Sequence, residues 1–302
     1  MSNDAEVLRK AMEGWGTDEA TLIKIIANRT NSQRQAIKAQ YKATYGRDLV
    51  EDLKKETHGN LEDAFVALFT EPVEYDAVSL REAMKGVGTN EDTLIEIITS
   101  RSPQQLQAIK TCYQKKYSRD LEADVKSETS GTLQKILITL LQGKRSTNSN
   151  PNQKQCQKIA NEIYNAGEAK LGTDESVFNK YFGTLSPQEL VCVAQHYHKL
   201  TGHTIIDAIE KEMHGDSKKA YRAIVYATLS PSEYFATRVH DAIKGLGTRD
   251  KLLIRILVTR DEVDMPMIKQ YYKTLYGKDM VEDIKNDISG HYQKLMIELC
   301  SH

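Results

Sequence analysis

Four short loops in this sequence could each turn several oxygen atoms toward one small space. Three of them read Gly-x-Gly-Thr, at residues 14–17, 86–89 and 245–248, and a fourth at residues 170–173 has lysine in place of the first glycine. Glycine has no β-carbon and can adopt positive φ, so such a loop can turn its carbonyl oxygens inward. Oxygen ligands suit a hard cation, and calcium is the natural occupant of such a cage.

A carboxylate follows each loop at the same distance of 42 residues. The pairs are Gly14 and Glu56, Gly86 and Glu128, Lys170 and Glu212, and Gly245 and Asp287. Each acid also lies three residues before a glycine. A single copy would be explained by an ordinary helix cap beside a solvated acid, because short motifs often match by chance. Four copies at one offset favour a second loop that delivers a carboxylate to the first.

Short helices are predicted to position these loops. Leu22, Ile25 and Ile26 follow the i, i+3, i+4 spacing of one helix face. The prediction for each repeat is five helices, of which the third in the first repeat ends at Gly46 in a left-handed cap. The fourth is expected to open at Asp48 and to end at Gly59. If helices one and two form a hairpin, and helices four and five another, the glycine loop and the acid lie side by side.

Helix starts are clearest at the third helix of the second and third repeats. Residues 102–105 and 186–189 read Ser-Pro-Gln-Gln and Ser-Pro-Gln-Glu, which combine a capping box with proline at the first helical position. The predicted boundaries are 4–72 for repeat 1, 76–143 for repeat 2, 156–231 for repeat 3 and 232–302 for repeat 4. Residues 144–155 are polar and are expected to be a linker between two halves.

The composition excludes several classes of protein. The 302 residues are 40% hydrophobic and 27% charged with a formal net charge of −1, so nothing indicates a nucleic-acid partner. The four cysteines are widely spaced, which favours free thiols in a reducing compartment. The polar, acidic first residues predict no signal peptide, and no apolar run approaches the roughly 18 residues of a spanning helix. Any membrane contact is therefore expected to be peripheral.

Four repeats spaced 72, 84 and 75 residues apart, each with this loop and this acid, resemble the annexin family. The resemblance covers nearly the whole chain, and residues 8–12 and 166–175 match phrases of annexin core repeats. It implies an all-α fold of four homologous five-helix repeats packed into a curved disc, with calcium sites on the convex face and a short N-terminal tail. It also implies reversible binding to acidic phospholipid, and no enzymatic activity.

The resemblance implies one calcium site in each repeat, built from three backbone carbonyls and one carboxylate. The sets are Met12, Gly14, Gly16 and Glu56; Met84, Gly86, Gly88 and Glu128; Gly167, Lys170, Gly172 and Glu212; and Ile243, Gly245, Gly247 and Asp287. Weaker accessory sites are implied at Thr17 and Glu19, and at Glu62.

Counting ligands suggests how such sites would work. Three carbonyls and one bidentate carboxylate supply five oxygens, whereas calcium takes six to eight. A lipid phosphate could complete the shell, so calcium affinity is expected to be weak without lipid. Four calcium ions would change the net charge from −1 to +7. We therefore expect calcium-dependent binding to acidic membranes by a cytoplasmic protein that moves to the inner face of membranes when calcium rises.

Apolar residues at the loop tips extend this hypothesis. Trp15, Val87, Leu171 and Leu246 occupy matching places, and they are expected to enter the membrane interface, with burial in the core as the alternative. Lys85, Lys170 and Lys244 could contact headgroups, whereas repeat 1 carries Glu13 there.

Other interpretations depend on different residues. Cys192, His196, His198 and His203 could form a zinc site or a nucleophile, but no second ligand pair stands out. Asp76, Glu96, Arg101 and Arg255 match residues that line the central passage of annexin discs, where we favour a structural ion-pair network over ion conduction. The alternative to a simple membrane binder is a scaffold that assembles laterally on membranes or contacts a cytoskeletal protein.

Overall fold

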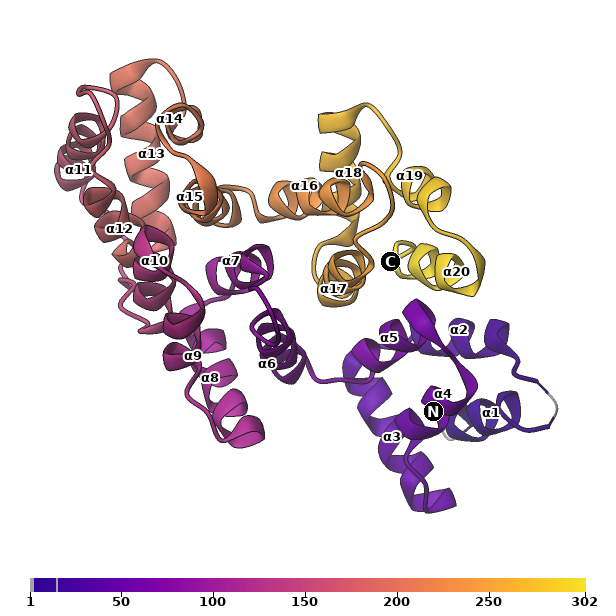
Figure 1. Cartoon of the computed structure of the whole chain (residues 1–302). Helices are drawn as coiled ribbons and strands as arrows, with labels where there is room; N and C mark the ends of the chain where they lie inside the picture. Colours follow the sequence, from indigo (N-terminus) through magenta and orange to yellow (C-terminus); the bar gives the residue numbers. More distant parts are fainter. Residues whose placement is uncertain (1–2, 15) are drawn as a thin grey trace. The chain divides into compact units, whose positions relative to one another are not determined.

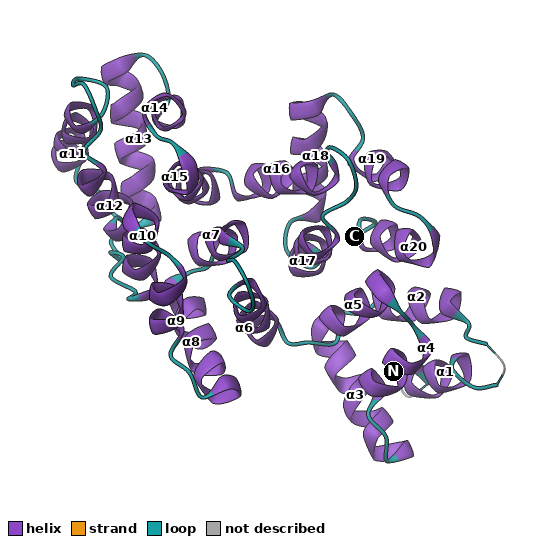
Figure 2. Ribbon diagram, in the orientation of Figure 1, coloured by secondary structure: helices purple, strands orange, loops and turns teal. Residues whose placement is uncertain are grey.

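Helices make up the regular secondary structure of this chain. The computed structural model describes residues 3–14 and 16–302, and within them it contains twenty α-helices and no β-strand (Figures 1 and 2). The all-α prediction is confirmed, and so is the prediction of five helices in each repeat.

The helices follow one another in four groups of five. The first group is α1 (Asp4–Ala11), α2 (Glu19–Ala27), α3 (Asn31–Tyr45), α4 (Leu49–Glu56) and α5 (Gly59–Leu68). The second is α6 (Pro72–Ala83), α7 (Glu91–Ser100), α8 (Pro103–Tyr117), α9 (Leu121–Glu128) and α10 (Gly131–Leu141). The third is α11 (Gln153–Ala166), α12 (Glu175–Thr184), α13 (Pro187–Thr201), α14 (Ile205–Glu212) and α15 (Gly215–Leu229). The fourth is α16 (Pro231–Ile243), α17 (Asp250–Arg260), α18 (Met265–Tyr276), α19 (Met280–Asp287) and α20 (Gly290–Leu299).

Capping chemistry explains where the third helices begin and end. Ser102 and Ser186 form the predicted capping boxes at α8 and α13, and Thr30 forms another at α3. At the other end of α3, Gly46 adopts φ +67°, and its amide donates to the carbonyl of Lys42. These contacts satisfy backbone groups that a helix end leaves without partners.

The predicted end of the fourth helix was wrong by three residues. The helix α4 ends at Glu56, and Gly59 is the first residue of α5 with φ +62°. Thr57 and His58 are extended, and the buried Thr57 hydroxyl donates to the carbonyl of Leu53 at 2.8 Å. The carboxylate of the pair therefore stands at the last turn of α4, beside a two-residue connection to α5.

The chain forms two compact units, and the predicted linker does not separate them. One unit contains Met1–Tyr75 with Ser232–His302, and the other contains Asp76–Pro231. Residues 144–155 lie inside the second unit, where the Ser146 amide donates to the Thr184 carbonyl at 2.7 Å and the Ser186 hydroxyl donates to the Asn148 carbonyl at 2.6 Å. These contacts join the segment to α12 and to the start of α13 within the second unit.

Each unit has its own apolar core. In the first unit α2 packs against α20 and α5 against α17, and in the second α7 packs against α15 and α10 against α12. Leu61, Ala64, Phe65 and Leu68 are buried on α5, as the predicted apolar face requires. Burial of each large aliphatic or aromatic side chain contributes roughly 1.5–3 kcal/mol, so these faces hold the helices that carry the loops.

Candidate metal centres

Each glycine loop is a tight connection closed by one backbone hydrogen bond. The amide of the residue that precedes the second helix donates to a carbonyl near the end of the first. The bonds run from Asp18 to Ala11 at 2.9 Å, and from Asn90 to Ala83, Asp174 to Ala166 and Arg249 to Ala242 at 2.8 Å. The four loops are thus held at the base in the same way, although their sequences differ.

Positive φ angles at the loop glycines explain why the motif needs glycine. Both glycines of repeats 1, 2 and 4 have φ between +81° and +108°. In repeat 3 Gly172 also has a positive φ, +79°, whereas Gly167 has φ −117°. A side chain at positive φ would be strained, so the turn of the backbone depends on the missing β-carbon.

The predicted carboxylates lie next to the loops, as their fixed offset indicated. The loop threonine donates a hydrogen bond to the acid in three repeats. The bonds join Thr17 to Glu56 at 2.7 Å, Thr89 to Glu128 at 3.1 Å, and Thr248 to Asp287 at 2.6 Å. In repeat 3, Thr173 instead donates to the backbone carbonyl of Glu212 at 3.2 Å. Lys211 Nζ lies 3.6 Å from the Glu212 carboxylate.

Three of these four threonines had no predicted role. Thr89, Thr173 and Thr248 were visible as the last residue of the motif, but only Thr17 was named, as an accessory ligand. The four hydroxyls span from the loop to the residue that carries the acid. The signal that could have revealed this role is the invariance of threonine across the four copies.

The side chains at three loop tips are fully exposed. Their relative accessibilities are 109% for Val87, 104% for Leu171 and 107% for Leu246, so none of the three folds back into the core. Trp15 lies outside the described residues. Among the loop lysines, Lys244 Nζ lies 2.5 Å from Asp241 and Lys85 Nζ lies 3.9 Å from Glu82. Lys170 is exposed, and in repeat 1 the substituting Glu13 pairs with Arg9 at 2.8 Å.

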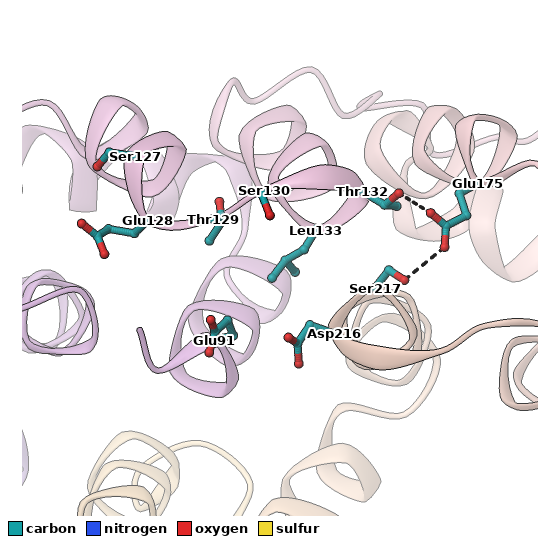
Figure 3. A pocket seen from close by; sticks show the side chains of 10 residues that line it. All are labelled: Glu91, Ser127, Glu128, Thr129, Ser130, Thr132, Leu133, Glu175, Asp216 and Ser217. Atoms are coloured by element: carbon teal, nitrogen blue, oxygen red, sulfur yellow. Dashed lines mark hydrogen bonds between the residues drawn. The ribbon is translucent and has the colours of Figure 1, made fainter. Parts of the chain in front are cut away.

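A polar pocket adjoins the second loop and acid pair. It is lined by Glu91, Ser127, Glu128, Thr129, Ser130, Thr132, Leu133, Glu175, Asp216 and Ser217 (Figure 3). Hydroxyl groups of Thr132 and Ser217 donate to Glu175 in this pocket, the second at 3.2 Å. A comparable pocket in the other unit contains Thr248 and Asp287 together with His58 and His291. Glu128 and Asp287 therefore face solvent-accessible hollows.

The two accessory positions differ in their surroundings. Glu19 begins α2, and its carboxylate lies 3.7 Å from Nδ1 of His291. Glu62 lies on the first turn of α5, at a position where repeats 2 and 4 carry Gln134 and Gln293. Each glutamine amide donates to two backbone carbonyls at the preceding helix end, at 2.5–2.8 Å. A carboxylate cannot donate such bonds, so Glu62 cannot cap the end of α4 in this way.

The donor set fits a hard cation. The loops and the acids beside them offer carboxylate, hydroxyl and backbone carbonyl oxygens, which are the ligands that calcium prefers. Within the described residues, His, Cys, Asp and Glu side chains form no group of three or more that could hold a metal ion. A metal centre here would thus depend on backbone oxygens, with one carboxylate in each repeat.

The predicted cysteine and histidine cluster is dispersed. Cys192 is buried on α13, while His196 Nε2 lies 2.9 Å from Gln153. Nε2 of His203 donates to Glu168 at 2.8 Å. Burial and the neighbouring Cys192 raise the pKa of Cys156 to about 12, which disfavours a reactive thiolate.

The polar residues assigned to a central passage are all buried. Arg101 donates to both carboxylate oxygens of Asp76 at 2.6 and 2.9 Å, a bidentate pair inside the second unit. Glu96 is buried on α7 in that unit, and Arg255 is buried on α17 in the first unit. Asp76 and Arg101 agree with the structural ion-pair interpretation.

Among the helices of residues 3–14 and 16–302, none combines the length and apolar composition that a bilayer-spanning segment requires. The fully exposed apolar surface at these loops lies instead at single side chains of the tips.

Comparison with known proteins identifies the family. A sequence model described as annexin matches residues 3–68, 75–140, 159–224 and 234–299. Human annexin A7 is 43% identical over 98% of this chain and 61% of its own length, and human annexin A13 is 43% identical over 99% of this chain and 95% of its own length. The chain thus spans about three fifths of annexin A7.

Solved structures agree with the sequence comparison. Annexin III superposes with a TM-score of 0.94 at 38% identity, covering 100% of this chain and 94% of its own. Chicken annexin V gives 0.92 at 40%, covering 100% and 95%. Calcium-bound annexin (Sm)1 gives 0.89 at 32%, covering 100% and 90%. The annexin family is known generally for calcium-dependent phospholipid binding, and this chain belongs to the annexin family.

Proposed function

We propose that this chain binds calcium at four loops and thereby binds acidic phospholipid membranes reversibly. One repeated observation carries the proposal. In three repeats a carboxylate from the end of the fourth helix stands 2.6–3.1 Å from the threonine of a glycine loop. A carboxylate beside carbonyls that can turn inward is the arrangement that a calcium ion would stabilise.

The ligands proposed for each repeat are the carbonyls of three loop residues and the carboxylate. They are Met12, Gly14, Gly16 and Glu56; Met84, Gly86, Gly88 and Glu128; Gly167, Lys170, Gly172 and Glu212; and Ile243, Gly245, Gly247 and Asp287. The loop threonine orients the carboxylate in repeats 1, 2 and 4. Calcium, when bound, would supply positive charge and open coordination positions that a lipid phosphate can fill. Thr17 together with Glu19, and separately Glu62, are proposed as accessory ligands.

The loop tips are proposed to add membrane contact. Val87, Leu171 and Leu246 are fully exposed, so they can enter the interface at no cost in core packing. Trp15 has the same place in the sequence of the first loop. Lys85, Lys170 and Lys244 lie beside the tips, and each positive charge near an anionic surface contributes about 1 kcal/mol. The chain would rest in the cytoplasm and move to the inner membrane face when calcium rises.

A calcium titration with and without vesicles tests this proposal. Because protein and lipid phosphate would share the coordination sphere of one calcium ion, calcium and lipid should each strengthen the binding of the other by the same free energy. The apparent calcium affinity should therefore rise at least tenfold when phosphatidylserine vesicles are present. Equal affinity with phosphatidylserine vesicles, with neutral phosphatidylcholine vesicles and without lipid would contradict the proposal.

Further membrane experiments separate this function from its alternatives. Lateral assembly on a supported membrane, followed by imaging of assembly size, distinguishes a scaffold from a simple binder. Binding that needs an added cytoskeletal protein would indicate the scaffold role.

A further inference from the structure

A buried tyrosine is anchored to the fourth helix in three of the repeats. The hydroxyl of the tyrosine on the third helix donates to an aspartate on the fourth. These bonds join Tyr41 to Asp52 at 2.9 Å, Tyr113 to Asp124 at 2.6 Å and Tyr272 to Asp283 at 2.8 Å. Each aspartate lies four residues before the proposed ligand carboxylate. The bond thus fixes the helix that delivers the carboxylate.

The third repeat keeps the tyrosine but moves its partner into the glycine loop. Ala208 occupies the aspartate position, four residues before Glu212. The hydroxyl of Tyr197 donates instead to Glu168 at 2.5 Å. Glu168 follows Gly167 in the loop, and its side chain is only 8% exposed. The anchoring carboxylate therefore belongs to the loop in this repeat.

Two more groups hold Glu168 from different elements. Nε2 of His203, in the connection between α13 and α14, donates at 2.8 Å. Lys211 Nζ on α14 lies 3.5 Å from the other carboxylate oxygen. The carboxylate therefore joins the loop to three places in the repeat, which are Tyr197 on α13, His203 in the following connection and Lys211 on α14.

The loop backbone between these contacts is ordered by its own hydrogen bonds. The Lys170 amide donates to the carbonyl of Gly167 at 3.2 Å, and the Ala169 amide donates to the carbonyl of Tyr164 at 3.1 Å. Ordering a loop before a ligand arrives reduces the entropy that binding must overcome. An anchored loop can thus present its carbonyls to calcium without a further loss of conformational entropy.

We propose that Glu168 is a positioning residue that holds the third loop in its calcium-binding conformation. This inference rests on the proposed function of that loop. Glu168 has a second effect through Lys211, whose ammonium lies 3.6 Å from Glu212. Glu168 also attracts this ammonium. Lys211 therefore competes less strongly with a bound cation for the Glu212 carboxylate.

The test uses a chain that keeps only the third site. Glu56→Gln, Glu128→Gln and Asp287→Asn remove the other three carboxylates. Three forms are then compared: this chain, the chain with Glu168→Ala, and the chain with Glu168→Ala and Ala208→Asp. The last variant gives Tyr197 an aspartate partner on α14, the fourth helix of this repeat, as Tyr41, Tyr113 and Tyr272 have in theirs. It still leaves the loop without its anchor. It is the matched control for a merely structural role.

Hydrogen exchange and calcium titration give two independent measurements. Without calcium, Glu168→Ala should raise the exchange rates of the Ala169 and Lys170 amides about tenfold, the size expected for losing a charged hydrogen bond. The calcium midpoint for binding phosphatidylserine vesicles should rise about tenfold. Adding Ala208→Asp should restore the melting temperature, but neither loop protection nor the midpoint.

Each contrary result has a distinct meaning. Unchanged exchange in Glu168→Ala would overturn the anchoring of the loop. Faster exchange with an unchanged midpoint, or a midpoint restored by Ala208→Asp, would overturn the positioning role. If the parent chain with only its third site shows no calcium response while the exchange result holds, the proposed function of that loop fails and the anchor stands as purely structural.

Discussion

The second and third repeats carry the same buried tyrosine and give it different partners. Tyr113 binds Asp124 on the helix that ends at Glu128, whereas Tyr197 binds Glu168 inside the glycine loop. Thr89 reaches the Glu128 carboxylate, whereas Thr173 reaches only the Glu212 carbonyl. The comparison indicates that a repeat can anchor either the helix that supplies the acid or the loop that supplies the carbonyls.

The largest expected effect is on the stability of the second repeat. Asp124 is buried and accepts bonds from Tyr113, Arg119 and Arg81. Asp124→Asn removes the charge that pairs with both arginines, so the free energy of unfolding should fall by about 3 kcal/mol. Urea denaturation measures this change. Asp120→Ala, which removes only the N-cap of the same helix, should cost about 1 kcal/mol. Equal losses would contradict the anchoring role of Asp124.

The next test uses the pH dependence of stability at the corresponding contact of the first repeat, where Tyr41 donates to Asp52. The hydrogen bonds from Arg47 lower the pKa of Asp52 from 3.8 to about 2. A carboxyl with a depressed pKa stabilises the folded state above its unfolded pKa and loses this contribution as the pH falls through its folded pKa. The advantage of the wild type over Asp52→Asn in melting temperature should therefore disappear between about pH 4 and pH 2. A difference that stays constant across this window would contradict the assignment.

The loop tips offer a matched pair of leucines, Leu171 in the anchored loop and Leu246 in a loop without such an anchor. Burial of a leucine in the interface is worth roughly 1.5–3 kcal/mol, so each change to serine should lower vesicle affinity about tenfold at fixed calcium. Leu171→Ser should lose more vesicle affinity than Leu246→Ser, because the loop that carries Leu171 is already ordered before it meets the membrane. Vesicle pelleting measures both variants, and unchanged affinity in both would show that the tips stay in water.

The smallest expected effect concerns the accessory position. Glu62→Gln places in repeat 1 the amide that repeats 2 and 4 carry. Without calcium this change should raise the free energy of unfolding by about 1 kcal/mol, because the amide can donate to the helix-end carbonyls. The rise in melting temperature on adding calcium should shrink. The reverse change in repeat 2, Gln134→Glu, should lower the free energy of unfolding without calcium and increase the rise in melting temperature on adding calcium. A calcium effect that does not change in either variant would exclude an accessory site.

Much of the helical framework could be predicted from the sequence because it depends on local chemistry. Gly46 and the boxes at Ser102 and Ser186 are local signals, and the structure confirms each of them. The juxtaposition of loop and acid was also predictable, because a constant offset between two motifs indicates a fixed spatial relation. The end of α4 was not, since it depends on the extended conformation of Thr57.

Tertiary contacts explain the remaining differences. The segment 144–155 looked like a linker by composition, but Ser146 and Asn148 bond to residues about forty positions away in the sequence. In the sequence, Glu168 looks like any solvated loop acid, because its partner Tyr197 is 29 residues away. Repeat 3 has Ala208 where the other repeats have an aspartate, and this difference becomes informative only when the repeats are superposed.

Pelleting with phosphatidylserine vesicles across calcium concentrations tests the central claim most directly, using a chain with Glu56→Gln, Glu128→Gln, Glu212→Gln and Asp287→Asn together. This variant should stay in the supernatant at calcium concentrations that pellet the wild type, and each single change should move the midpoint only part of the way. Pelleting of the fourfold variant at the same midpoint as the wild type, or wild-type pelleting that persists in excess chelator, would contradict the account.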